Sequence, residues 1–255
     1  MVEVTARRVK ANGTQLPLFF GAIIGHSFAE LSTKSTSFVA PGVGFKVYPG
    51  GGNAMILPIA LDLPTWNELL DDDPYDMPDN YSFNAATGSV GPGSDGIAEV
   101  NIYPSQNTLM PAGNRGTVDI GSSNNSTADL SRQILYGINS NDMSYMTNGE
   151  LVVDPGPLFL NGDTGISAGT KDELAQIIGE PRAIPLFIEV SGNGNNATYS
   201  VVRFVGVRVM AVNLTGPMSK KHLIVQPTPF SDSTVIRGEA VITPDMIYSQ
   251  PSMIE

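Results

Sequence analysis

The chain has 255 residues and a net charge of −11, although charged residues make up only 15% of it. Its 27 glycines and 19 prolines are typical of a turn-rich, mainly β protein, and the absence of cysteine excludes disulfides and thiolate metal sites. The acidic balance, without a cluster of Lys and Arg, argues against a surface for nucleic acid or anionic membranes.

The first 52 residues read as strands joined by glycine-rich connections. Residues 2–9 alternate with period two and stop at Asn12-Gly13, which predicts a strand closed by a turn. The apolar run LPLFFGAIIG, residues 16–25, is too short to span a bilayer, and we expect a buried connection or short helix. Residues 28–39 predict a second strand, and residues 41–52 a long glycine loop. A strand at residue 2 needs a neighbour, and its edge could pair with another segment or a partner.

The middle of the chain combines strands with one short helix and an acidic loop. Residues 54–61 predict an apolar strand, and residues 64–71 a short helix that turns Trp66 toward the core. The run DDDPYDMPD, residues 71–79, contains two prolines and repelling charges, which disfavours regular structure. Residues 80–96 predict a hairpin or loop, and residues 97–103 a strand.

Two further helices carry clear signals. The helix over residues 127–138 starts near Ser126 or Thr127 and places Leu130, Ile134 and Ile138 on one face. The helix over residues 170–178 starts with a capping box between Thr170 and Glu173 and stops at Gly179.

The last third predicts an antiparallel meander with strands at residues 183–190, 197–215 and 222–226. The long central strand is apolar on both faces, so we expect it to be covered on both sides, with the helices on one of them. Residues 227–255 predict an extended Pro-rich tail. The predicted fold class is α+β, mainly β: antiparallel sheets, long Gly/Pro/Asn-rich loops and two to three short helices in one domain, residues 1–255, with a possible sub-boundary near 104–115.

Two motifs suggest chemistry, but neither has the context that its chemistry needs. Residues 117–124, TVDIGSSN, are similar to the phosphate turn of actin-like ATPases, which requires a following hairpin rather than the helix expected here. GISAG, residues 165–169, matches the nucleophile elbow of serine hydrolases, but Ser167 does not sit directly between a strand and a helix. His222 is the only downstream histidine. We therefore expect no catalytic and no cofactor-binding residues, and keep a hydrolase using Ser167 as a remote alternative.

Metal ligands are sparse. His26 and His222 are the two histidines, and neither belongs to a spaced motif for zinc or iron. The weak calcium candidates are the carboxylates of the acidic run, for which a solvated loop is the favoured interpretation: Asp71, Asp72, Asp73, Asp76 and Asp79. An adhesin-like module that binds glycan or calcium through residues 41–53 and 71–80 remains the main alternative function.

Several long segments resemble one protein family. They are RGTVDIGSSNNSTADLSRQILYGI, LFLNGDTGISAGTKDELAQIIGEPRAIPLF, EVSGNGNNATYSVVRFVGVRVMAVNLTG and SKKHLIVQP, within residues 115–227. Together with VTARR, LPLFFGAIIG and ALDLPTW upstream, they resemble the TadG-like proteins of the Tad (Flp) pilus-assembly systems, closest to the planctomycete-type form.

The resemblance implies an extracytoplasmic, non-enzymatic protein of pilus biogenesis or surface attachment, held by an N-terminal membrane helix. Its expected partners are other pilus-assembly or surface proteins, with no nucleic acid, small-molecule substrate or cofactor. The sequence departs from that pattern, because it contains no run of 18 or more apolar residues that could form such a helix. We therefore expect an excised ectodomain, or the product of a truncated or mispredicted reading frame.

Overall fold

The computed structural model describes residues 2–71, 77–104, 115–121, 126–192, 194–239 and 246–254. It divides into two units: unit 1 comprises Met1–Ala40 and Gln250–Glu255, and unit 2 comprises Pro41–Ser249. Most of the expected sub-boundary at 104–115 lies outside the described residues. Among the described residues, no helix has the length and apolar character needed to cross a membrane.

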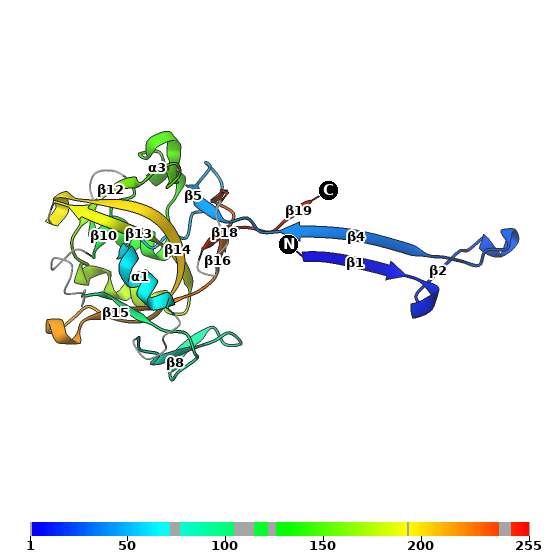
Figure 1. The fold of residues 1–255 in the computed structure, drawn as a ribbon, viewed down its shortest axis with the longest axis horizontal. Coiled ribbons are helices and arrows are strands. Elements are labelled where there is room, and N and C mark those ends of the chain that lie inside the picture. The colour runs from blue at the N-terminus through cyan, green and yellow to red at the C-terminus, as the bar shows by residue number, and fades with distance from the viewer. Residues whose placement is uncertain are drawn as a thin grey trace. The chain divides into compact units, whose positions relative to one another are not determined.

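Unit 1 is built on a long hairpin (Figure 1). Strand β1 (Val2–Arg8) pairs antiparallel with β4 (Leu31–Phe38), which provides the neighbour that the first strand needs. The end of β4 also pairs with β19 (Ser252–Ile254), giving the strand order β1-β4-β19. The hairpin loop carries two 3-10 turns and one small strand pair: η1 (Lys10–Asn12), η2 (Gly21–Ile24), β2 (Leu16–Pro17) and β3 (Phe28–Ala29).

The sheet of unit 2 is organised around one strand of 17 residues, β14 (Ala197–Asn213). One edge of β14 pairs with β13 (Pro181–Ser191), and the other pairs first with β12 (Leu158–Asp163) and then with β15 (His222–Pro227). The β13-β14-β15 pairing confirms the predicted meander. The sheet is completed by β10 (Thr117–Val118) beside β12, β6 (Leu61–Asp62) parallel to β13, and β9 (Val100–Tyr103) beside β15.

Both faces of this sheet are covered, as the apolar pattern of β14 predicts. One core cluster joins Val205, Val207 and Val209 of β14 to helix residues that include Trp66 and Leu174.

The helices of unit 2 are α1 (Leu63–Leu70), α2 (Thr127–Tyr136), α3 (Ser140–Met143) and α4 (Lys171–Gln176), with 3-10 turns η3 (Thr147–Gly149), η4 (Ala168–Thr170), η5 (Gly194–Asn196) and η6 (Met218–Lys220). The mainly β fold class is therefore confirmed.

The second core cluster lies against a small sheet that the sequence did not predict. Strand β5 (Gly42–Lys46) pairs with β11 (Glu150–Val152) and β17 (Val235–Arg237), and its Phe45 is fully buried. The prediction of a glycine loop over residues 41–52 is thus wrong for residues 42–46. Gly44 is required there because a Cβ would lie 2.0 Å from the carbonyl oxygen of Leu151.

The extended tail is also a wrong prediction. After β15 the chain forms β16 (Phe230–Asp232), β17 and β18 (Ile247–Ser249), and β16 pairs parallel with β18. Phe230, Val235 and Ile247 lie in the core. The predicted strand over 54–61 is mostly a buried extended segment with isolated bridges, whereas the hairpin at 80–96 is present as β7 (Tyr81–Asn84) and β8 (Ser89–Pro92).

Candidate functional site

The segment that is similar to a phosphate turn leads from β10 into α2. Helix α2 begins after Ser126, whose Oγ accepts a hydrogen bond from the backbone N–H of Asp129 at 3.1 Å. A strand followed by a capped helix is the arrangement that the sequence favoured. Residues 122–125, which complete the motif, lie outside the described residues.

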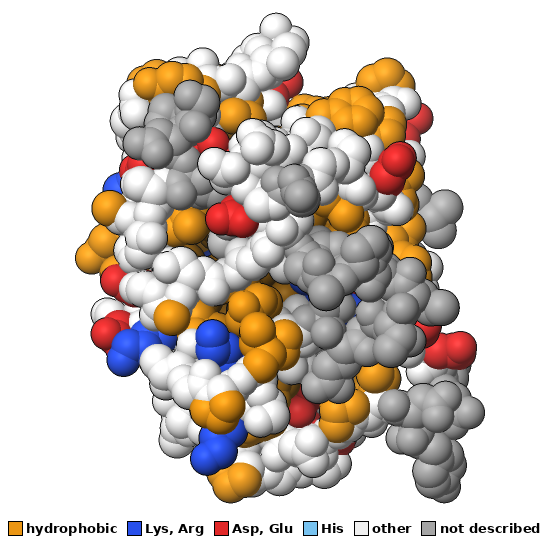
Figure 2. Space-filling model, turned by 90° about the vertical axis from the view of Figure 1, so that its left-hand side faces the viewer, with side chains coloured by type: hydrophobic (Ala, Val, Ile, Leu, Met, Phe, Trp, Pro, Cys, Tyr) orange, Lys and Arg blue, Asp and Glu red, His pale blue; other side chains and the backbone are white. Residues whose placement is uncertain are grey.

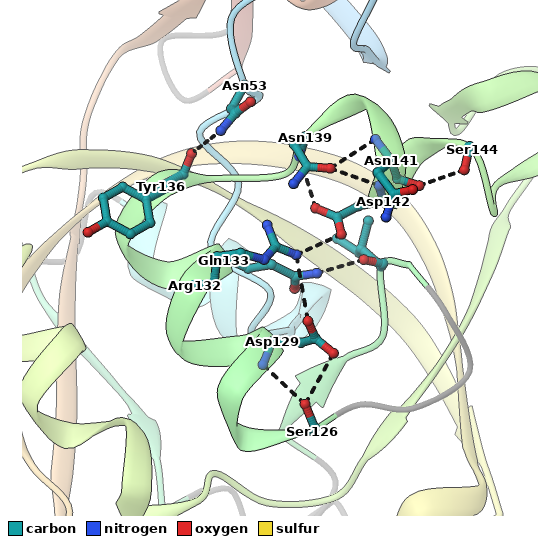
Figure 3. A network of polar contacts seen from close by, with 11 residues as sticks. Asn53, Ser126, Asp129, Arg132, Gln133, Tyr136, Asn139, Asn141, Asp142 and Ser144 are labelled. Atoms are coloured by element: carbon teal, nitrogen blue, oxygen red, sulfur yellow. Dashed lines mark hydrogen bonds and ion pairs between the residues drawn. The ribbon is translucent and has the colours of Figure 1, made fainter. Parts of the chain in front are cut away.

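A polar cavity of about 120 Å³ lies beside this segment, and its lining comes mainly from α2, α3 and the residues after β10 (Figure 3). Arg132 is held by Asp142 at 2.7 Å and lies 3.9 Å from Asp129. Gln133 donates to the carbonyl oxygen of Ile120 at 2.7 Å. Asp142 also accepts from the backbone N–H of Asn139 at 2.9 Å, so the network ties α2 to α3 and to the end of β10.

The charges of this cavity oppose a phosphate ligand. Asp119 lines the cavity half-buried, and burial raises the pKa of its carboxyl, with a further contribution from the negative charge of Asp129. Arg132 is already shared between two carboxylates. We therefore interpret the network as a structural connection between α2 and α3.

The residues of the suggested hydrolase have local structural partners. Ser167 caps the 3-10 turn η4, and its Oγ accepts from the N–H of Gly169 at 3.2 Å. His222 starts β15, and its Nδ1 contacts the carbonyl oxygen of Lys220 at 3.2 Å. The expected capping box at Thr170 is wrong: the Thr170 hydroxyl donates to the carbonyl oxygen of Ser167, because the helix is preceded by η4.

The acidic run is only partly described. Asp72, Asp73 and Asp76 lie outside the described residues, and Asp71 is the C-cap of α1. Asp79 accepts hydrogen bonds from the Ser94 hydroxyl and from the backbone N–H groups of Asp95 and Gly96. These bonds lower its pKa, and they give the carboxylate a structural role beside the β7–β8 hairpin. Within the described part of the chain, no group of three or more His, Cys, Asp or Glu side chains could hold a metal ion.

A buried ion pair near α1 was missed by the sequence reasoning. Arg115 Nε lies 2.6 Å from Asp62 Oδ2, and both side chains are almost completely buried. Asp62 also caps α1 through the N–H of Thr65 at 3.0 Å. The Asp-Leu-Pro start of the helix could have indicated the cap, but nothing in the sequence connects residue 62 to residue 115.

The most exposed apolar group among the described side chains lies at the end of the unit 1 hairpin. Phe19 is 92% exposed, Phe20 70% and Ile23 81%. The expectation that residues 16–25 form a buried connection is therefore wrong, although a short 3-10 helix, η2, is present. By contrast, on the face in Figure 2 the visible apolar side chains form small groups separated by polar surface.

The loop that carries these side chains has a defined shape. The rings of Phe19 and Phe20 meet edge to face with centroids 4.8 Å apart. The N–H of His26 donates to the carbonyl oxygen of Gly21 at 2.8 Å. A Cβ at Gly21 would lie 1.8 Å from the carbonyl oxygen of His26, so only glycine allows this closure. We call Phe19, Phe20 and Ile23 the apolar tip.

The apolar tip is a candidate interaction surface because a cluster of exposed aromatic and aliphatic side chains on a protein surface is typical of a contact site. The sequence signal was present in LPLFFGAIIG, but hydrophobicity alone does not distinguish a buried segment from an exposed contact. No family model, no curated protein and no solved structure matches this chain.

Proposed function

We propose that the chain is a non-enzymatic assembly component that acts through protein–protein contacts made by unit 1. The observation that carries this proposal is the apolar tip, three exposed hydrophobic side chains on a closed loop. Phe is among the residues enriched in the cores of protein interfaces.

The architecture of unit 1 supports the same proposal. Among its described side chains no hydrophobic one is buried, so the described part of its sheet has no core of its own. A hairpin or small sheet without a packed face is only marginally stable in water. Contact with another protein would supply the missing apolar partner.

The resemblance to TadG-like proteins supports a more specific proposal. In that case the assembly is a bacterial Tad (Flp) pilus or a related attachment system, and the chain acts outside the cytoplasm. This part rests on the resemblance alone. A gene-neighbourhood map without a secretion ATPase or Tad platform genes would overturn it.

Site-specific photo-crosslinking in the native cell tests the contact. A photoreactive phenylalanine is placed at Phe20, and the matched control is placed at Phe159, which is 66% exposed in unit 2. We expect a discrete protein adduct from position 20 and none from position 159. Adducts with lipid only, or the same pattern from both positions, would contradict a protein contact at the tip.

A further inference from the structure

Strand β1 forms an open edge of the unit 1 sheet. In the part of the chain that the structure describes, β1 pairs with β4 alone, along all seven of its residues. The outer edge therefore presents backbone N–H and C=O groups that can accept another strand.

We propose that this edge pairs antiparallel with β1 of a second copy of the chain, across a two-fold axis at Thr5. The inference rests on the proposed assembly function and names the partner. Antiparallel pairing of two identical edges places a two-fold axis perpendicular to the sheet, so residues facing each other have the same parity in sequence. An axis at Thr5 therefore places Glu3 opposite Arg7 of the second copy, twice, and Val4 opposite Ala6.

The charge pattern selects this register over its neighbours. An axis at Val4 would place Glu3 opposite Thr5, and an axis at Ala6 would place it opposite Val9, so neither forms an ion pair. Parallel in-register pairing would set Glu3 against Glu3 and Arg7 against Arg7, and like charges directly opposite are destabilising.

The other open edge of the sheet lacks such complementarity. Strand β4 has β19 beside it only from Thr36 to Phe38, so within the described residues Leu31–Lys34 also borders no third strand. Lys34 is the only charged residue in that stretch. An axis at Ser32 would place Glu30 opposite Lys34, but Glu30 lies outside β4 and already accepts a hydrogen bond from the backbone N–H of Lys10, which leaves β1 as the better edge.

The contacts of β1 suit this arrangement. Glu3 already lies 2.6 Å from Lys34 Nζ on the neighbouring strand, so in the dimer it would lie between Lys34 and Arg7 of the second copy. Exposed ion pairs contribute little free energy, so in the dimer the charges fix the register. The affinity comes from the backbone ladder and from Val4, which is 60% exposed in the single chain and would be covered in the dimer. A seven-residue ladder covers less than the ~1,200 Å² of a stable interface, so we expect a concentration-dependent dimer.

Disulfide trapping tests the axis directly because the chain has no cysteine. In Thr5→Cys the only possible disulfide joins two copies, and facing residues have Cβ atoms about 4.5–5.5 Å apart, close to disulfide geometry. The matched control is Ser32→Cys, which is exposed on β4 opposite Arg7 of the same chain. We expect mild oxidation of the full chain to yield a dimer with Thr5→Cys and little with Ser32→Cys.

Charge exchange in the Thr5→Cys background tests the register. Glu3→Arg or Arg7→Glu alone should remove most of the disulfide dimer, and the two together should restore it, with unchanged circular dichroism. Equal dimer yields at positions 5 and 32, or no restoration by the double exchange, would overturn the β1 pairing. The Phe20 crosslink reports on the apolar tip and not on β1. If the β1 pairing is overturned but the crosslink persists, the proposed function still holds.

Discussion

In unit 2 the long strand β14 is covered on both faces, whereas in unit 1 the strands β1 and β4 are exposed along most of their length. Both units contain phenylalanines, yet Phe187 is fully buried and Phe19 is 92% exposed. Unit 2 therefore obtains its stability from its own core. Unit 1 leaves the hydrophobic side chains of Phe19, Phe20 and Ile23 exposed.

The largest expected effect compares these two phenylalanines. Phe187→Ala should lower the free energy of unfolding by about 3–5 kcal/mol, because it leaves a cavity beside Tyr199, whose ring centroid lies 5.1 Å away. Phe19→Ala should leave the free energy of unfolding within about 0.5 kcal/mol of the parent value. Urea unfolding measures both, followed by Trp66 fluorescence for unit 2 and by far-UV circular dichroism for the whole chain, and equal losses would refute the contrast between the units.

The same comparison can be made with ion pairs. Asp62→Asn should cost about 3 kcal/mol, since it leaves the buried Arg115 guanidinium without its counter-charge. Glu3→Gln breaks the exposed pair with Lys34 and should not measurably change unfolding, because water screens that pair. A large effect of Glu3→Gln in monomeric protein would show that unit 1 depends on its own charges.

The buried pair also predicts a pH dependence. Burial alone raises the pKa of Asp62, but the hydrogen bonds from Thr65 and the Arg115 charge outweigh it, so the folded pKa is lower than usual. Its contribution to stability is therefore complete above the unfolded pKa of about 3.9 and is lost as pH falls through the folded value. Acid unfolding of the parent and of Asp62→Asn should converge as the pH drops. Parallel curves would contradict this contribution.

The smallest expected effect on stability comes from Gly21→Ala. The added Cβ would collide with the carbonyl oxygen of His26 and open the tip loop, while unit 2 keeps its core. We expect an unchanged unfolding midpoint but a loss of the Phe20 crosslink. Gly25→Ala is the control for backbone strain, because its φ is +78° and a Cβ there has nothing within 4 Å.

The sequence predicted the elements that rest on local patterns. The meander around β14 and the helices near Trp66 and Leu130 were predictable because their apolar periodicity and turns are continuous along the chain. The pairing of β14 with β13, however, has a register shift beside Phe187. The shift places Val201 in the same core cluster as Phe204, although simple alternation puts residues 201 and 204 on opposite faces of the strand.

The missed elements depend on contacts between distant segments. Strand β5 was read as a loop because Gly42 and Gly44 suggest turns, yet they allow close packing against other strands. Its partners β11 and β17 have three residues each, too few to show a period. The tip was misread because its composition is that of a core segment, and only the fold reveals that it is exposed.

The pairing of β19 with β4 has a consequence for biosynthesis. Because Ser252–Ile254 follow all of unit 2 in the sequence, ribosomes deliver the third strand of unit 1 only after Pro41–Ser249 has been made. Domains generally fold as units during synthesis, at about 5–20 residues per second. Translation of Pro41–Ser249 at this rate takes about 10–40 s, so β1 and β4 wait for β19 until nearly all of the chain has been made, and the three-stranded sheet of unit 1 is completed last.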